Sequence, residues 1–183
     1  MSITEILKEK TKNLHDLTEE KFQSEKIFRG DFTKEDYQKL LLYNYHLINT
    51  FEKPVFELLT ENHSEKLQLD KRTKLQFIQK DLAALAISEN ISLEKPLLKN
   101  EAEAIGMLYV MEGSTLGGNV IAKNLGKLEN FRGVTFNYFG IYGEETGPMW
   151  KKFKQVMDEN YSEEDLNDIL NGAERAYHFL LQS

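Results

Sequence analysis

Three glycines interrupt the most regular helical stretch of the sequence, from Glu101 to Leu128. The segment E-G-S-T-L-G-G-N, residues 112–119, contains Gly113, Gly117 and Gly118. Each glycine costs the interior of a helix roughly 0.8–1 kcal/mol relative to alanine. A fold that keeps all three in one helix has to compensate for this cost, for example through a close approach that side chains would block.

The spacing of the glycines allows three interpretations. Gly113 and Gly117 lie one turn apart, which lets a second helix approach closely. The pair Gly117–Gly118 is also typical of the end of a helix. The third interpretation is a flat ligand that lies directly against the backbone, with the helix kinked over it. The glycines alone do not distinguish these three.

Helix start signals recur along the rest of the chain, and strand signals are scarce. Ser2 with Glu5, and Thr33 with Asp36, have the spacing of N-terminal capping boxes. The expected helices span about residues 3–22, 34–60 (with a bend near Pro54), 67–87, 101–128, 148–161 and 163–181, with a loop over 129–145. The pattern predicts an all-α fold, organised as a single domain over residues 1–183.

The composition excludes several classes of site. The chain has no cysteine, which rules out disulfides, thiolate catalysis, and zinc or iron–sulfur sites built on cysteine. A formal net charge of −7 argues against a general nucleic-acid binder, which would need a basic face. The N-terminus lacks the apolar segment of a signal peptide, and no apolar run is long enough to span a bilayer. We therefore expect a cytoplasmic protein without nucleic-acid or membrane partners.

A stripe of polar residues on the first expected helix carries the clearest chemical signal. Lys8, Lys12, His15 and Glu19 are spaced i, i+4, i+7 and i+11, which places them on one helix face. An imidazole can ligate a metal through one nitrogen while a carboxylate one turn away accepts the proton of the other. Two ammonium groups nearby can pair with carboxylates of a ligand. The stripe therefore fits iron porphyrin, although a solvated face with weak ion pairs explains the same spacing.

The other three histidines carry weaker signals. His46 lies in an aromatic and apolar segment and is expected in the core, His63 is expected to be solvated in a turn, and His178 is expected to pair with Glu174 at the surface. A di-iron carboxylate site requires glutamate three residues before two of the histidines. That class of site is excluded, because the residues three before the four histidines are Lys12, Tyr43, Thr60 and Arg175.

Two segments resemble the signatures of biliverdin-producing haem oxygenases, especially their bacterial members. L-K-E-K-T-K-N-L-H-D-L-T-E, residues 7–19, resembles the proximal helix of that family, and M-E-G-S-T-L-G-G-N, residues 111–119, resembles its glycine-rich distal helix. Weaker likeness over residues 32–59 and 150–157 extends the resemblance to nearly the whole chain. It implies a multi-helical bundle with haem between the first helix and a kinked distal helix.

The resemblance implies roles on the proximal side of the haem. His15 matches the iron ligand of the family, and Glu19 matches the residue that contacts this histidine. Lys8 and Lys12 match basic residues that face the haem propionates. Lys154, in K-F-K-Q, matches a further basic residue near the haem edge.

The resemblance also implies roles on the distal side, with two departures. Gly113, Gly117 and Gly118 match glycines whose backbone lies over the haem. Ser114 stands where many members carry an aspartate that organises distal water; a hydroxyl still holds water but is not an acid. Asp158 stands where a basic residue is expected, which affects the propionate contacts on that side.

The implied activity is oxidative cleavage of haem, by O2 and external electrons, to biliverdin, carbon monoxide and ferrous iron. Haem is then both cofactor and substrate, and Gly113 and Ser114 are the expected catalytic contributors on the distal side. The sequence has no dinucleotide-binding motif, so the expected electron donor is a separate protein such as a ferredoxin or a flavin reductase.

The alternative is a non-catalytic haem carrier or sensor on the same fold, which Ser114 motivates. A thiaminase-like relative would need a cysteine nucleophile, and a plain helical interaction module would bind no haem.

Overall fold

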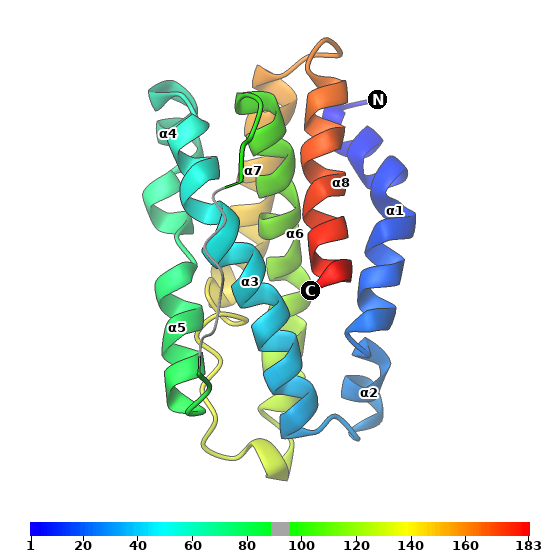
Figure 1. Cartoon of the computed structure of the whole chain (residues 1–183), viewed down its shortest axis with the longest axis vertical. Helices are drawn as coiled ribbons and strands as arrows, with labels where there is room; N and C mark the ends of the chain where they lie inside the picture. The colour runs from blue at the N-terminus through cyan, green and yellow to red at the C-terminus, as the bar shows by residue number, and fades with distance from the viewer. Residues whose placement is uncertain (89–95) are drawn as a thin grey trace.

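The computed structural model describes residues 1–88 and 96–183, and every regular element in these two ranges is helical. The α-helices are α1 (Ile3–Lys21), α2 (Ser24–Arg29), α3 (Lys34–Leu58), α4 (Glu61–Leu67), α5 (Leu75–Ala84), α6 (Glu101–Leu125), α7 (Thr146–Asn160) and α8 (Leu166–Gln182). Three short 3-10 helices are η1 (Leu69–Arg72), η2 (Glu129–Phe131) and η3 (Gly143–Glu145). The long helices run side by side, with α1 and α8 adjacent at one edge (Figure 1). The all-α prediction is confirmed.

Local capping chemistry sets the start of two long helices. In α1 the Ser2 hydroxyl accepts from the Glu5 amide at 3.3 Å, and the Glu5 carboxylate accepts from the Ser2 amide at 2.8 Å. Thr33 and Asp36 form the same reciprocal pair at the start of α3. Both predicted capping boxes are therefore confirmed.

The expected single helix over residues 67–87 is wrong, because α4 ends at Leu67 and two shorter elements, η1 and α5, follow it. Gln68 adopts the left-handed conformation, with φ of 53°, and thereby ends α4. The chain continues through η1 before α5 begins at Leu75. The short helix α2 was also not predicted.

The last helix begins later than expected. The Asp165 carboxylate accepts from the Ser162 amide at 2.9 Å, which closes a turn before the helix. Helix α8 therefore begins at Leu166 rather than directly after Ser162. Pro148 lies in the first turn of α7, as predicted.

The closest approach between helices occurs where α6 crosses α8, at glycines outside the 112–119 segment. A Cβ atom at Gly106 would lie 1.9 Å from the Ile169 carbonyl oxygen. A Cβ atom at Gly172 would lie 1.9 Å from the Glu103 carbonyl oxygen. Both contacts are shorter than any real Cβ contact, so only glycine fits at Gly106 and Gly172. This crossing fixes α6 against the bundle.

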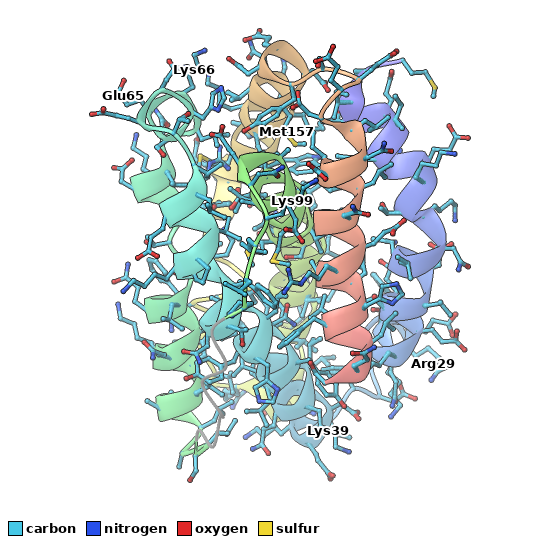
Figure 2. All side chains as sticks on the ribbon, turned by 45° about the horizontal axis from the view of Figure 1, so that its top comes forward. Arg29, Lys39, Glu65, Lys66, Lys99 and Met157 are labelled. Carbon is cyan, nitrogen blue, oxygen red and sulfur yellow. The ribbon has the colours of Figure 1, made fainter. Side chains whose placement is uncertain are left out.

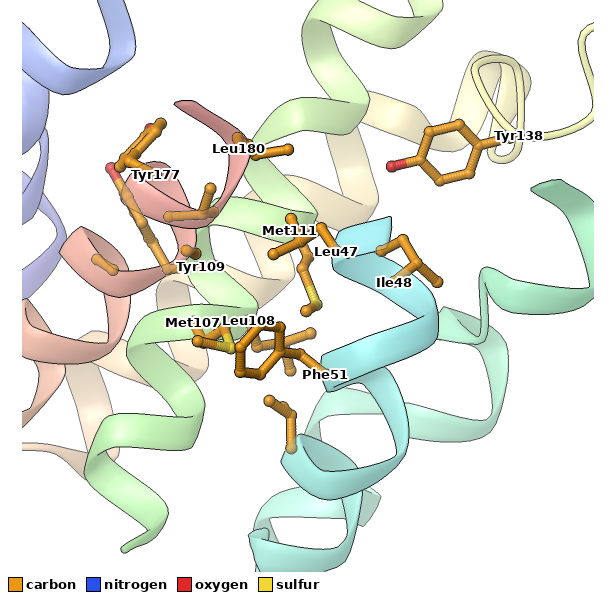
Figure 3. Packing of buried hydrophobic residues seen from close by; sticks show 14 of the residues in the cluster. Leu47, Ile48, Phe51, Met107, Leu108, Tyr109, Met111, Tyr138, Tyr177 and Leu180 are labelled. Atoms are coloured by element: carbon orange, nitrogen blue, oxygen red, sulfur yellow. The ribbon is translucent and has the colours of Figure 1, made fainter. Parts of the chain in front are cut away.

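The hydrophobic core lies between α3, α6 and α8, and most charged side chains lie outside it. Phe51 of α3 and Met107 of α6 are buried and pack in the same cluster (Figure 3). Charged side chains project outward at both ends of the bundle (Figure 2), for example Lys66 at one end and Arg29 at the other. The binary pattern thus follows the helix period.

A buried cluster of charges attaches α6 to its neighbours just before Gly113. The Glu112 carboxylate accepts from the Arg72 guanidinium and the Lys74 ammonium, and all three side chains are at most 1% exposed. The Tyr142 hydroxyl also donates to Glu112, at 3.0 Å, and burial beside this carboxylate raises the pKa of Tyr142. The Lys74 amide donates to Glu52 of α3 at 2.6 Å. The cluster therefore joins α3, η1, α6 and the segment after Tyr138.

The three histidines other than His15 differ in part from the positions predicted for them. The solvated position expected for His63 is wrong: it lies in α4, its side chain is 16% exposed, and its Nδ1 lies 2.7 Å from Glu101 Oε1. His46 is only partly buried, and this burial lowers its pKa. His178 is exposed, and within the described ranges no ion pair joins it to Glu174.

Candidate functional site

A cavity of about 570 Å³ lies between α1 and α6, with further side chains from α2, α3, α7 and α8. It brings together eight residues that the sequence analysis selected: Lys8, His15, Glu19, Gly113, Ser114, Gly117, Gly118 and Lys154. The ninth, Lys12, lies in an adjoining pocket that also contacts His15. Residues more than 100 positions apart in the sequence thus meet in one place.

His15 lies in this cavity between two carboxylates. Its Nδ1 is 3.5 Å from Asp16 Oδ1, and its Nε2 is 3.7 Å from Glu19 Oε1. Within the described ranges these three side chains are the only group of possible metal ligands whose atoms lie within 4.8 Å of one another. Whichever ring nitrogen binds a metal, a carboxylate stands beside the other and can fix the tautomer. The Tyr177 ring meets the imidazole edge-on, at 6.4 Å between centroids.

The three selected lysines take different positions. Lys8 and Lys154 line the main cavity from α1 and α7. Lys12 instead donates to Asp16 Oδ2 at 2.5 Å, and its side chain is 72% exposed. This hydrogen bond from Lys12 lowers the pKa of Asp16. Two cationic groups are therefore available in the cavity for an anionic ligand.

The three distal glycines have different surroundings. A Cβ atom at Gly117 would meet nothing within 4 Å, whereas one at Gly113 would lie 3.4 Å from the Trp150 ring. A Cβ atom at Gly118 would lie 3.1 Å from the Phe139 carbonyl oxygen. The interpretation as a helix end is wrong, because α6 continues to Leu125. The glycines do not bring a second helix backbone close, since the nearest atoms belong to the Trp150 side chain of α7 and to Phe139 in a loop.

Aromatic side chains form a wall of the cavity that the sequence analysis missed. Tyr109 of α6 packs on Trp150 of α7 at 5.3 Å between ring centroids, and both residues line the cavity together with Tyr177. Burial raises the pKa of Tyr109 and of Tyr177 to about 12 each, so both remain neutral phenols near neutral pH. The site thus offers a largely apolar interior with cations on α1 and α7, which suits a flat apolar ligand with acidic substituents.

Comparison with known proteins identifies the family to which this chain belongs. The sequence model of the family described as heme oxygenase matches residues 1–182. The chain belongs to the haem oxygenase family. A curated haem oxygenase from Xanthomonas campestris pv. campestris (strain 8004) is 28% identical over 153 residues, which cover 82% of this chain and 90% of that protein.

A solved haem oxygenase structure has a fold similar to that of this chain. The structure of Neisseria meningitidis haem oxygenase with NO and CO bound aligns with a TM-score of 0.70 and 21% sequence identity. The alignment covers 100% of this chain and 89% of that chain. The predicted family, fold class and haem oxygenase activity are confirmed. Among the described residues, no helix is both long and apolar enough to cross a membrane.

Asp158, the second departure from the family pattern, forms hydrogen bonds to another helix of the protein. Its carboxylate accepts from the Thr4 amide at 2.9 Å and from the Thr4 hydroxyl at 2.8 Å. These bonds attach the first turn of α1 to α7, and α1 carries His15. The residue that stands where a haem contact was expected thus fixes one end of the helix that carries His15.

We expect Asp158→Ala to lower the free energy of unfolding by about 1–2 kcal/mol, because it removes an N-terminal cap and a charge-assisted hydrogen bond. Urea unfolding followed by circular dichroism measures this change. Glu159→Ala is the matched control, since Glu159 is an exposed neighbour on α7 whose one hydrogen bond to the described residues is with Gln155. Equal stability of the two variants would contradict the role given to Asp158.

We expect Gly117→Ala to raise the stability of the haem-free protein by roughly 0.5–1 kcal/mol, because alanine favours the helix and its methyl group meets no atom. The same methyl group protrudes into the cavity, so haem affinity should fall. Urea unfolding and haemin titration measure the two effects. In contrast, Gly106→Ala should destabilise the protein, because its methyl group would collide with the Ile169 backbone. If Gly117→Ala left haem binding unchanged, this glycine would not face the ligand.

Proposed function

We propose that this chain binds haem in the cavity between α1 and α6, with His15 as the iron ligand, and cleaves it to biliverdin, carbon monoxide and ferrous iron. One observation carries the proposal: His15 on α1 and the open backbone at Gly117 on α6 line the same cavity. A porphyrin needs an axial ligand on one face and close backbone on the other. We further propose that residues 1–183 form one cytoplasmic domain around this site.

The residues of the cavity fit haem in size, polarity and charge. Its volume of about 570 Å³ lies within the range of small-molecule sites. Leu116 lines the cavity and is 40% exposed, so a flat ligand would cover apolar surface there. Lys8 and Lys154 supply cations for two propionates.

Bound haem would supply the redox chemistry. It would also be the substrate, because the bond that is cleaved belongs to the haem ring. The protein orients and shields this group. His15 would hold the haem iron through one ring nitrogen, and Asp16 or Glu19 would orient the ring through the other nitrogen. Gly117 leaves space beside the distal backbone. Ser114 donates its hydroxyl hydrogen to the Met111 carbonyl at 2.7 Å, so its oxygen can accept a hydrogen bond from cavity water.

The reaction also requires O2 and a source of electrons. We propose that electrons come from a separate protein such as a ferredoxin or a flavin reductase, since the chain contains no dinucleotide-binding motif. Lys154 would lie beside the haem and Lys151 is an exposed neighbour on α7, so this helix offers positive charge to an acidic donor.

The decisive experiment adds one equivalent of haemin to the purified protein, then ascorbate in air, and follows the visible spectrum. Decay of the Soret band with growth of the biliverdin absorption is the expected result. A Soret complex that persists would instead identify a haem carrier or sensor, the alternative that Ser114 motivates. Absence of any complex would overturn the proposal.

A further inference from the structure

We propose that Asn44 is the hydrogen-bond donor of the distal side of the cavity, the wall formed by α3 and α6, and that Tyr138 positions it. This inference rests on the proposed function, because it concerns the side of the haem that faces away from His15. Asn44 lines the cavity from α3 and is 4% exposed. It lies within residues 32–59, where the likeness to the family is weak, and outside the two signature segments at residues 7–19 and 111–119.

The hydrogen bonds of Asn44 determine how its amide is oriented. Its Nδ2 donates to the Leu40 carbonyl oxygen at 2.9 Å. A carbonyl oxygen only accepts, so the nitrogen of the amide must lie on that side. Its Oδ1 accepts from the Tyr138 hydroxyl at 3.2 Å. An amide nitrogen carries two hydrogens, and no described residue accepts the second one from Asn44.

The other groups of the distal wall that lie near Asn44 have no free hydrogen to donate. The Ser114 hydroxyl hydrogen is directed to the Met111 carbonyl oxygen at 2.7 Å. The glycine amides lie inside the continuous helix α6, where they bond to its carbonyl groups. Tyr109 of α6 lines the cavity as well, and Figure 3 shows its ring beside Tyr177 on the side of α6 that faces away from α3. The remaining lining side chains of α3 and α6, which are Leu40, Val110, Leu116 and Ile121, are apolar. We infer that Asn44 presents its second amide hydrogen to the cavity from α3, whereas Tyr109 is a separate donor on another side of α6.

Tyr138 and Asp81 hold the amide in this orientation. The Tyr138 amide donates to Asp81 Oδ2 at 2.8 Å, and Asn137 donates to Asp81 Oδ1 through its backbone and its side chain. Asp81 is 2% exposed, so this loop is attached to α5 inside the protein. Figure 3 shows the Tyr138 hydroxyl pointing from the loop toward the helices. Burial raises the pKa of Tyr138 to about 12, so the phenol keeps its proton and remains a donor to Asn44.

A fixed amide donor has a specific chemical consequence. It stabilises negative charge on a small molecule in the distal part of the cavity without rearranging. Unlike a carboxylic acid, it cannot release a proton, so protons would arrive through water that Asn44 and Ser114 orient. Asn44 thus compensates in part for the acid that is absent at Ser114.

The test uses carbon monoxide as an infrared probe of the reduced haem complex. A donor near the probe oxygen lowers the C–O stretching frequency, so Asn44→Leu should raise it. In the ferric complex, cyanide affinity should fall about tenfold, which corresponds to one charge-assisted hydrogen bond. Tyr138→Phe should shift both quantities in the same direction by less, because the amide remains but is less well oriented.

Asn124→Leu is the matched control, because Asn124 of α6 makes the same i to i−4 bond, to Val120 at 2.8 Å, outside the cavity. It should leave both quantities unchanged. Tyr138→Phe removes a single oxygen and keeps the test available if Asn44→Leu folds poorly. Unchanged frequency and affinity in the Asn44 and Tyr138 variants would overturn the inference and leave the proposed function intact. A wild-type protein that forms no Soret complex would overturn both.

Discussion

We expect His15→Ala to abolish haem degradation, with a loss of more than roughly 100-fold in turnover. Altering a residue that merely supports a metal ligand costs about 10- to 100-fold, so removal of the ligand itself should cost more. The His15 ring is accessible to a ligand, because its side chain lines the cavity and is 53% exposed. Single-turnover spectra with haemin and ascorbate measure this effect.

Two controls separate ligation from unspecific damage. His178→Ala removes an exposed histidine of α8 that does not line the cavity, and it should behave as the wild type. Added imidazole should restore the spectrum of the His15→Ala haem complex, because it can occupy the vacated position. If the variant kept wild-type turnover, the iron ligand would lie elsewhere.

We expect Glu112→Ala to lower the free energy of unfolding by about 3–5 kcal/mol. The substitution leaves the Arg72 guanidinium and the Lys74 ammonium buried without a partner, and the desolvation of such charges is not compensated. Since Glu112 precedes Gly113, the start of the distal segment should also lose its attachment to η1 and haem affinity should fall. Urea unfolding of the haem-free protein measures the first effect, and haemin titration measures the second.

Glu129→Ala provides the comparison for an exposed ion pair. Glu129 pairs with Arg132, and both side chains are 80% exposed. Water screens such pairs, so the expected change is about 0–1 kcal/mol. A Glu112 variant no less stable than this control would show that Arg72 and Lys74 find other partners.

The sequence predicted those parts of the fold that depend on local chemistry. The capping boxes at Ser2 and Thr33 gave correct helix starts, since the partner of each cap lies three residues away. The region of residues 67–87 was misjudged because distant contacts determine it. Arg72 and Lys74 enter the interior to reach Glu112, and a straight helix through this region would not place both there.

The same distinction between local motifs and distant contacts applies to the candidate site. His15, Gly117 and Lys8 were predicted because they lie in short motifs with a regular helix period. Asn44 and Tyr138 gave no signal, because their roles depend on a hydrogen bond between residues 94 positions apart. Composition and periodicity do not encode such a contact, which exists only after the loop attaches to Asp81.

The aromatic wall of the cavity allows ligand binding to be followed by the fluorescence of the protein itself. Trp150 is the only tryptophan of the chain. Its ring lies 3.4 Å from where a Cβ atom of Gly113 would stand and lines the cavity. Light emitted by this indole therefore originates within a few ångströms of any bound chromophore. Filling and emptying of the pocket can thus be timed by intrinsic fluorescence, without a label and without relying on the colour of the pigment.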